Sequence, residues 1–499
     1  MEFLWYNLFM NENPVYKTVE DIISKAKTAN GKTIKSLNIN HRDLSGSNKG
    51  VIGQIVEEGV FEYPINSRAE PDFANVGVEL KVTGIKKNND NSFSAKERLV
   101  LNIIDYMSEG TKSFQNSSFW QKNKSLLLMF YYYDKKIELP DYKIVDSILY
   151  TYPKEDLAII KNDWKIINDK ISKGNAHLIS ESDTMYLAAC TKGANGQAIR
   201  PQPFSNELAK QRAYCLKPSY VNHILRTYGI DKEAQKMFGF ASVNKAIDDM
   251  LRKDNLTSKN LVSVKELENN TFENVMEARV KPFIGISEDV FTKEYGININ
   301  AKHKFELIVS RMLDCYTSIN RADEFLKANI VVKTVRIEEN NRIIESMSLP
   351  CFKYKEIYKE DWADSQLRNY FYETKFMFVV FKKKNGSYRF AGIKFWNMPI
   401  EILDKELYEV WIKTKDIISK GLIVKGYSID KNGKKTRITN FPGMKDNQYC
   451  HVRPHARNAD DVYPLPVRDV LSGQKSYTKH CFWLNNSFVL NILKNILNK

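Results

Sequence analysis

Several hallmarks of secreted, membrane-spanning and zinc-binding proteins are absent from this sequence. The chain has six cysteines and none form a C-x-x-C pair, which argues against a disulfide framework or a zinc site. The first residues, Met1–Trp5, have no basic segment, so we expect no signal peptide. The longest apolar runs, such as 125–133 and 376–381, match a strand and are too short to cross a bilayer. We therefore expect a cytoplasmic protein with reduced thiols and no membrane partner.

Acidic side chains are too few to balance the basic ones. The 75 Lys and Arg residues face 60 Asp and Glu residues, which gives a net charge of +15. Such an excess suits a polyanionic partner, with nucleic acid first and an acidic membrane surface second. A hydrophobic content of 43% and an aromatic content of 12% are ample for packed cores, and 499 residues favour two or three domains.

Features of the first half recur in the second half in the same order. Trp164 and Gly174 correspond to Trp411 and Gly421, and each pair lies in a pattern typical of an amphipathic helix that ends at glycine. Two apolar runs joined by a polar hairpin precede each helix and predict antiparallel strand pairs. The segment 214–221 then returns as 482–489. Matching order along both halves favours a duplicated domain.

The region between the halves is charged and lacks strand-like runs. We interpret it as a helical linker over residues 236–275. This division predicts a first domain over 1–235 and a second over 276–499.

The segment 71–83 places charged residues within an apolar strand pattern. From Val76 onward apolar residues alternate with others, which predicts a strand with Glu79 and Lys81 side by side on one face. Asp72 lies just before the strand, close enough to converge with Glu79. Burying these charges costs several kcal/mol unless a metal ion or a partner compensates.

These residue types suit phosphodiester hydrolysis. Two carboxylates, Asp72 and Glu79, hold divalent ions that polarise a phosphate and lower the pKa of a water. Lys81 orients or helps to deprotonate that water and offsets charge on the reacting phosphorus. Hard oxygen ligands without His or Cys favour Mg²⁺, with Mn²⁺ as a substitute.

Similar spacings occur elsewhere in the chain. Glu373 and Lys375 form another Glu-x-Lys pattern, and Asp134 with Asp141 and Lys143 repeats the whole spacing next to an expected hairpin turn, where charges are usually solvated. Glu57 ends a predicted helix over 50–59. It either faces the metal ions or is a solvated residue at the end of the helix.

The motifs together resemble the MutH-like nuclease family. The resemblance rests on Gly53–Glu57, Asp72 and Gly77–Lys81, and it is closer to type II restriction endonucleases that cut GATC. The segments 96–104, 186–195 and 450–455 also resemble that group. The resemblance therefore spans nearly the whole chain in a two-part layout.

This resemblance implies the restriction-endonuclease-like fold, an α/β (α+β) mixed sheet flanked by helices with the acids at a strand end. It implies Mg²⁺, double-stranded DNA containing GATC as substrate, and a cut before the G on each strand. By the same resemblance Glu57 is a helper carboxylate, and Lys192 lies in a loop that enters the major groove. We expect further DNA contacts from Asn195, Arg200, Arg212, Lys217, Arg453, His455, Arg457 and Asn458.

The second half lacks one residue of the catalytic set. Lys333 corresponds to Lys81, but Val331 stands where Glu79 is expected, and valine cannot bind a cation. We therefore expect two tandem domains of the same fold, with the second a degenerate copy for DNA binding or regulation. With one active site per chain, we expect a monomer that pairs on DNA.

Two other functions remain open. One is a mismatch-repair nickase acting at GATC, although the mismatch-repair enzyme resembles one half of this chain. The other is a DNA-binding protein without catalysis, although the intact set of Asp72, Glu79 and Lys81 argues against it.

Overall fold

The computed structural model describes residues 16–45, 50–65, 68–88, 91–192, 198–240, 260–316, 318–344, 346–429, 433 and 435–497. By its internal contacts the chain divides into two units. The first comprises Met1–Phe272 with Arg321–Ala328, and the second comprises Glu273–Asn320 with Asn329–Lys499. The domain boundaries at 235 and 275 stay a prediction, and residues 241–259 of the expected linker lie outside the described residues.

The main sheet of the first unit has four strands in the order β2-β1-β4-β5. β1 runs parallel to β4, whereas β2 and β5 are antiparallel to their neighbours. The parallel register sets Glu79 opposite Leu126. The strands are β1 (Glu79–Lys87), β2 (Phe93–Ala95), β4 (Ser125–Tyr133) and β5 (Ile144–Thr151).

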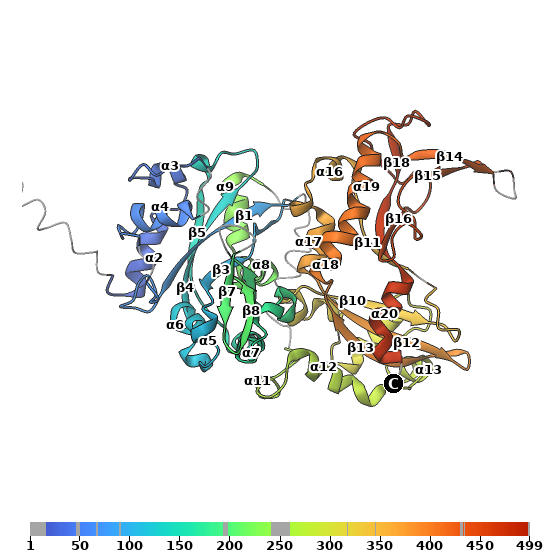
Figure 1. The fold of residues 1–499 in the computed structure, drawn as a ribbon, viewed down its shortest axis with the longest axis horizontal. Helices are drawn as coiled ribbons and strands as arrows, with labels where there is room; N and C mark the ends of the chain where they lie inside the picture. Colours follow the sequence, from blue (N-terminus) through green and yellow to red (C-terminus); the bar gives the residue numbers. More distant parts are fainter. Residues whose placement is uncertain are drawn as a thin grey trace, which may run out of the picture. The chain divides into compact units, whose positions relative to one another are not determined.

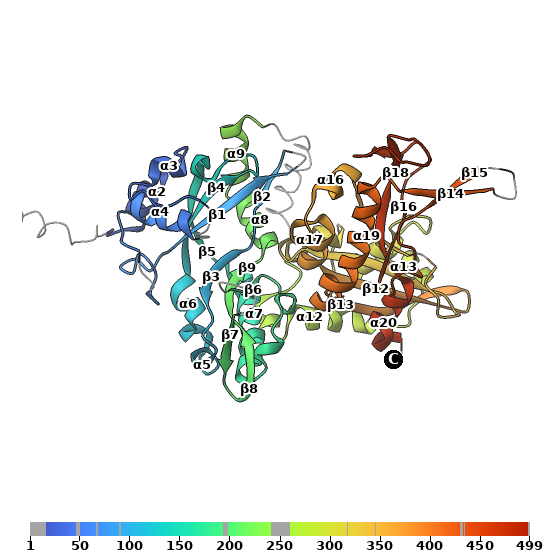
Figure 2. The same ribbon diagram turned by 45° about the horizontal axis from the view of Figure 1, so that its top comes forward.

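Both faces of this sheet are buried. On one face Leu127 and Met129 of β4 join a core with residues of α2 and α4. On the other face the alternate residues of β4, Leu126, Leu128 and Phe130, are also fully buried. Figures 1 and 2 show α2, α3 and α4 on one side of the sheet and α8 and α9 on the other. These helices are α2 (Val19–Lys27), α3 (Ile34–Leu37), α4 (Val51–Gly59), α8 (Pro218–Thr227) and α9 (Ile230–Phe238).

A second, three-stranded sheet of the first unit has the order β3-β9-β6, and β7 and β8 form a separate hairpin. Its strands are antiparallel. The strands are β3 (Leu99–Ile103), β6 (Leu187–Thr191), β7 (Ile199–Gln202), β8 (Ser205–Lys210) and β9 (Arg212–Leu216). The helices around them are α5 (Tyr106–Glu109), α6 (Ser118–Asn123), α7 (Lys154–Ser172) and α11 (Val264–Leu267).

The second unit has its own pair of sheets. One has the order β10-β12-β13, with β10 parallel to β12, and the other has the order β11-β19-β16. Hairpins β14-β15 and β17-β18 are separate. The strands are β10 (Ile330–Ile337), β11 (Met347–Phe352), β12 (Lys375–Lys384), β13 (Ser387–Trp396), β14 (Val424–Ile429), β15 (Lys435–Thr439), β16 (Cys450–Pro454), β17 (Val462–Pro464), β18 (Ser476–Thr478) and β19 (His480–Leu484).

Aromatic and aliphatic side chains on both faces of β12 pack the second unit. Phe376 and Phe378 join a core with Trp411 of α19 and Phe488 of α20. On the opposite face the ring of Phe381 lies 4.6 Å from the ring of Phe305 in α14. The helices are α12 (Phe272–Val280), α13 (Glu288–Glu294), α14 (Lys304–Met312), α16 (Tyr354–Lys359), α17 (Gln366–Glu373), α18 (Ile400–Ile402), α19 (Tyr408–Ser419) and α20 (Asn486–Leu497).

These observations confirm a mixed α/β protein with several sheets. The long helices expected before Gly174 and Gly421 are α7 and α19, and both glycines adopt a positive φ at the helix end. Among the described residues, no helix combines the length and apolar character needed to cross a membrane.

A buried ionic cluster holds α15 (Asp323–Lys327) within the first unit. The Lys327 ammonium lies 2.7 Å from the Asp156 carboxylate of α7 and 2.5 Å from that of Asp323. The Glu324 carboxylate accepts hydrogen bonds from the backbone N–H groups of 261–262. Lys327 is buried, so its charge depends on the carboxylates of Asp156 and Asp323 for compensation.

Glu324 predicts a pH dependence of stability. Burial is the main cause that raises the pKa of Glu324 from 4.5 to about 7. Between these values the folded protein binds the proton more tightly than the unfolded chain, so this group destabilises the fold as pH rises through that window. Glu324→Gln removes this loss. We therefore compare the urea midpoints of the variant and of wild type at each pH. The difference between them should shift in favour of the variant as the pH rises from about 5 to about 8.

The exposed acid Glu20 of α2 provides a control. Glu20→Gln should leave the pH dependence of the midpoint unchanged. A pH dependence of Glu324→Gln identical to that of wild type would contradict the prediction.

Candidate active site

A tight turn before β1 brings Asp72 and Glu79 together. Phe73 and Val78 pair as an isolated antiparallel bridge, and the two backbone N···O distances between them are 2.9 Å and 3.3 Å. Gly77 closes the turn with φ of +67°, a left-handed conformation that glycine adopts without steric cost. The chain therefore reverses, and Asp72 lies beside the first residue of β1.

The polar contacts of this turn lock the two acids in place. The Asp72 N–H donates to Glu79 Oε2 at 3.2 Å, and the Leu80 N–H donates to Asp72 Oδ2 at 3.0 Å. Lys81 Nζ donates to Glu79 Oε1 at 2.7 Å. The predicted convergence of Asp72, Glu79 and Lys81 is therefore present in the geometry.

One detail of the predicted strand is wrong. The alternating pattern placed Val76 and Gly77 in the strand, whereas β1 begins at Glu79 and both residues lie in the turn. The physical reason is the left-handed backbone at Gly77, which an extended strand does not contain. The alternation of side chains therefore starts later than the sequence indicates.

Glu79 carries a charge in a poorly solvated place. Its side chain is 2% exposed, and burial raises the pKa of its carboxyl, an effect that Lys81 opposes. An ionised carboxylate at such a position requires compensation by cations or hydrogen bonds. The site therefore favours a bound cation or a charged substrate.

Glu57 approaches the same acids from α4. Burial raises its pKa to about 7, and the negative charges of Asp72 and Glu79 add to the shift. A solvated residue at the end of a helix would not sense both acids in this way. The observed environment thus favours the interpretation of Glu57 as part of the site.

Sequence reasoning missed Lys122. Its Nζ lies 3.6 Å from Glu79 Oε1 and donates to the Arg68 carbonyl at 2.9 Å. Lys122 belongs to α6, which leads directly into β4. Since β4 is the parallel neighbour of β1, residues just before both strands meet at one edge of the sheet. The pairing of β1 with β4 brings Lys122 to the site, and a local sequence pattern does not reveal this pairing.

The carboxylates of the site can supply a few oxygen ligands to a hard cation. Among the described residues, no group of three His, Cys, Asp or Glu side chains is gathered as a complete metal site. Asp72 and Glu79 nevertheless lie side by side, and both are near enough to Glu57 to raise its pKa. Mg²⁺ is usually held by one or two protein carboxylates together with water and substrate phosphate, so these residues fit that ion.

Comparison with known proteins agrees with this geometry. Over 511 aligned residues the chain is 33% identical to the type II restriction enzyme Sau3AI of Staphylococcus aureus, covering 97% of this chain and 99% of that enzyme. The chain belongs to this restriction-enzyme family. The resemblance drawn from the motifs is thereby confirmed.

Part of this restriction-enzyme chain also matches the mismatch-repair nucleases. Residues 61–163, which include Asp72, Glu79, Lys81 and Lys122, match the family described as DNA mismatch repair enzyme MutH. The MutH protein of Shewanella woodyi is 28% identical over 44% of this chain and 96% of its own length. That of Pasteurella multocida is 26% identical over 30% of this chain and 66% of its own length.

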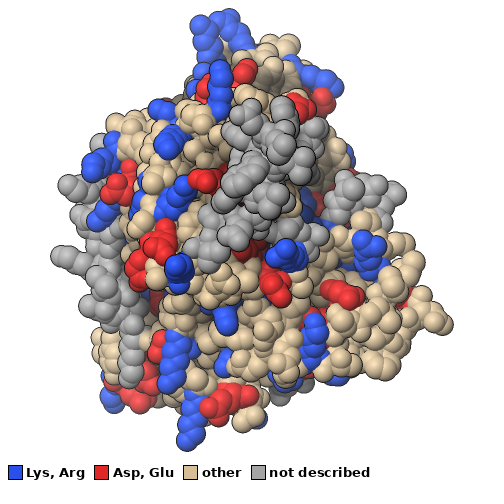
Figure 3. All heavy atoms as spheres, turned by 90° about the vertical axis from the view of Figure 1, so that its left-hand side faces the viewer, with Lys and Arg blue, Asp and Glu red and all other residues tan. Residues whose placement is uncertain are grey.

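Two of the expected DNA contacts in the first unit of this Sau3AI homologue are exposed. Lys192 follows β6 and Arg200 lies in β7, and the side chains of both reach solvent. Asn195 lies outside the described residues. On the face drawn in Figure 3, basic side chains are interspersed with acidic ones and do not form one continuous patch. The net positive charge alone therefore does not locate the DNA on that face.

Arg212 and Lys217 both make contacts within the protein, and their role at DNA stays a prediction. Arg212 is 8% exposed and donates to the Ala189 carbonyl at 2.7 Å. Lys217 donates to the Thr184 carbonyl, which ties it to the chain leading into β6. Arg212 is therefore buried against β6, whereas Lys217 is half-exposed. The sequence could not show this, because burial of a basic residue depends on its tertiary neighbours.

The expected contacts of the second unit lie on and after β16. Arg453, His455, Arg457 and Asn458 are all exposed. The Arg453 guanidinium lies 4.6 Å from the centroid of the Trp483 ring. Asn458 Oδ1 accepts the N–H groups of the residues at 460–461, which orders the loop. Their positions are compatible with a DNA contact, and their role stays a prediction.

The turn at Gly77 provides a mutational test. A β-carbon at its φ costs about 1–2 kcal/mol for most residues, and asparagine tolerates this conformation better than a β-branched residue does. We expect Gly77→Val to slow DNA cleavage markedly more than Gly77→Asn, because strain in the turn separates Asp72 from Glu79. Single-turnover cleavage rates and thermal unfolding of both variants would measure this.

The β-carbon itself has room at this position. A β-carbon at position 77 meets only the Lys124 side chain, with its Cε at 3.4 Å. Equal cleavage rates for the two variants would mean that the geometry of the turn does not control the site.

Proposed function

We propose that this protein is a Mg²⁺-dependent restriction endonuclease that hydrolyses double-stranded DNA at GATC. The observation that carries the proposal is the convergence of Asp72 and Glu79, next to Lys81 and Lys122, in a family of restriction enzymes. The GATC target and the cut before the G follow from the family resemblance. Because DNA is the proposed substrate, we place the enzyme in the cytoplasm.

The side chains divide the chemistry between them. Asp72 and Glu79 would hold Mg²⁺, which supplies charge stabilisation at the phosphate and an activated water. Lys81, bonded to Glu79 at 2.7 Å, is placed to orient the attacking water and to neutralise charge on the phosphate oxygens. Lys122 adds a second cation beside Glu79. Glu57, which lies near both acids, would be a helper carboxylate, as the family resemblance implies.

We further propose that the unit carrying this site has the restriction-endonuclease-like fold and that the second unit is its degenerate copy. Three-strand orders support this: β1-β4-β5 corresponds to β10-β12-β13, and β3-β9-β6 corresponds to β11-β19-β16. Glu79 pairs with the second residue of β4, and Val331 pairs with the second residue of β12. The residues two positions earlier, Gly77 and Asn329, both have positive φ.

The loss of chemistry in the second unit follows from that correspondence. Val331 replaces the metal-binding carboxylate, while Lys333 remains. Lys333 lines a pocket of about 150 Å³, and burial lowers the pKa of its ammonium group. We propose that this unit contacts DNA or regulates cleavage through the loop of Arg453, His455, Arg457 and Asn458, while Lys192, Asn195 and Arg200 contact DNA in the first unit.

Plasmid cleavage tests the catalytic assignment. Unmethylated plasmid and Mg²⁺ should give discrete fragments with GATC spacing, and chelation of the metal by EDTA should abolish them. Glu79→Gln and Lys81→Ala should each reduce cleavage by at least about a hundredfold while DNA binding is largely kept, because these side chains act on the reacting phosphate. Fragment analysis and binding measured in Ca²⁺ separate the two effects.

Matched lysines provide the controls. Lys143→Ala removes the exposed lysine of the rival Asp134–Lys143 spacing, and Lys333→Met removes the counterpart of Lys81 in the second unit. Both should keep wild-type cleavage. Normal cutting by Lys81→Ala would relocate the site, and nicking of one strand without double-strand cleavage would favour a mismatch-repair activity instead.

One catalytic set per chain requires either two chains or two successive nicks to cut both strands. We propose that the protein is a monomer that pairs on its target. Gel filtration or light scattering with an uncleavable GATC duplex should show two chains per duplex, whereas a duplex lacking GATC should not. The same mass in the presence and absence of the GATC duplex would contradict pairing.

A further inference from the structure

Lys122 reaches Glu79 from a helix of only six residues, Ser118–Asn123. A helix this short has little stability of its own, so its place depends on contacts at its ends. We propose that Glu109, an acid outside the active site, is a positioning residue that fixes α6 and thereby holds Lys122 beside Glu79. This inference rests on the proposed role of Lys122 in cleavage.

Glu109 is a fully buried carboxylate at the end of α5. Its exposed fraction is 0%. The N–H of Ser118, the first residue of α6, lies 3.1 Å from Glu109 Oε1 and 3.3 Å from Oε2. Lys112 Nζ lies 3.3 Å from Oε2, and the Tyr214 hydroxyl donates to Oε1 at 3.3 Å. The carboxylate thus accepts bonds from a helix start, a lysine and a strand of the neighbouring sheet.

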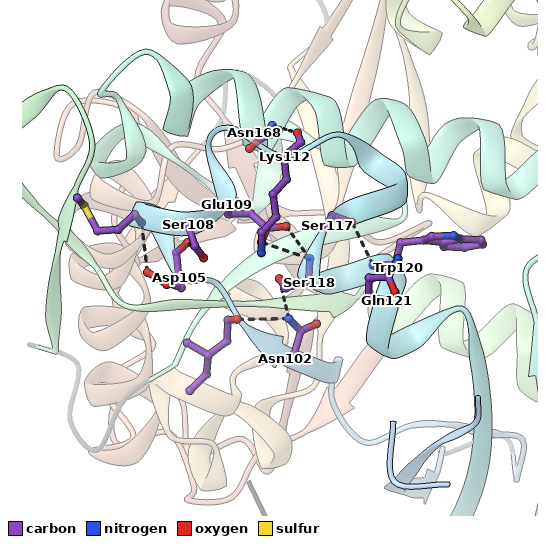
Figure 4. Close-up of polar contacts among 12 residues, drawn as sticks. Asn102, Asp105, Ser108, Glu109, Lys112, Ser117, Ser118, Trp120, Gln121 and Asn168 are labelled. Carbon is purple, nitrogen blue, oxygen red and sulfur yellow. Dashed lines mark hydrogen bonds and ion pairs between the residues drawn. The ribbon is translucent and has the colours of Figure 1, made fainter. Parts of the chain in front are cut away.

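Other contacts fix the same helix start, as Figure 4 shows. Ser117 Oγ accepts the Trp120 N–H at 3.1 Å, and the Asn102 amide donates to Ser118 Oγ at 3.1 Å. At the other end of α6, the Asn123 amide donates to Asn102 Oδ1 at 2.8 Å. The helix is therefore held at both ends, and Glu109 supplies the charged contact among them.

A negative charge at this place has a specific effect. The first N–H groups of a helix have no partner within the helix, and a carboxylate there satisfies them and complements the helix dipole. Lys122 follows about one turn later, so a small rotation or shift of the helix start moves its ammonium away from Glu79. Catalytic groups lose effect steeply when they are misplaced by about 1 Å.

The second unit contains a related arrangement in which the acid, Glu360, is half-exposed. Glu360 Oε2 accepts the N–H of Gln366, the first residue of α17, at 3.3 Å, and Ser365 Oγ accepts the Arg368 N–H at 3.2 Å. α17 leads into β12 as α6 leads into β4. Tyr372 precedes β12 by as many residues as Lys122 precedes β4. Glu360 therefore provides a matched control for the loss of a helix-capping carboxylate.

Glu109→Gln is the informative substitution. Glutamine has nearly the same shape and keeps one oxygen for the Ser118 N–H, but it loses the charge and the contact with Lys112. We expect single-turnover cleavage of a GATC duplex with Mg²⁺ to fall about tenfold. Duplex affinity, measured in Ca²⁺ by fluorescence anisotropy, should stay within about twofold, because the binding surface is unchanged. Glu360→Gln should leave the cleavage rate unchanged.

A double-mutant cycle identifies the route of the effect. If Glu109 acts through Lys122, Glu109→Gln has no further effect on cleavage in a Lys122→Met background. The same tenfold loss in both backgrounds, or an equal loss from Glu360→Gln, would overturn the inference. Wild-type cleavage by Lys122→Met would overturn the proposed role of Lys122 itself. Wild-type cleavage by Glu109→Gln together with an impaired Lys122→Met would overturn only the role of Glu109.

Discussion

The parallel pairing of β1 with β4 sets the position of the charged groups in the candidate active site. Glu79 is the first residue of β1 and lies opposite Leu126, so whatever precedes β4 lies at the same edge. The turn closed by Gly77 places Asp72 at that edge, and α6 places Lys122 there as well. A change in the register of this strand pair would separate all of these groups at once.

This arrangement concentrates charged side chains where there is little water, which is energetically unfavourable. Burial raises the pKa values of Glu57 and Glu79, and the negative charge of Asp72 adds to both shifts. Lys81 and Lys122 lower this cost beside Glu79. In the second unit Lys333 is partly buried with a lowered pKa, and Val331 lies two positions before it. The acids and the lysines of the candidate active site therefore depend on one another for charge compensation.

The sequence predicted much of this because its signals are local. The strand pairs of both halves, the helices that end at Gly174 and Gly421, and the candidate set of Asp72, Glu79 and Lys81 all lie within short segments. The start of β1 was misplaced, because an alternating pattern does not reveal a left-handed turn. Burial is another property that a local pattern does not show: Arg212, an expected DNA contact, is buried and donates to a backbone carbonyl within the protein.

The amino-acid sequence by itself determined the family and the acids that converge at the turn. The tertiary structure decided which distant residues complete the site. Lys122 and Glu109 have no recognisable motif, and they matter because α6 is fixed between a buried carboxylate and the parallel neighbour of β1. The physical reason is that periodicity and spacing report contacts along one segment. Burial and charge compensation arise only when segments far apart in the chain pack together.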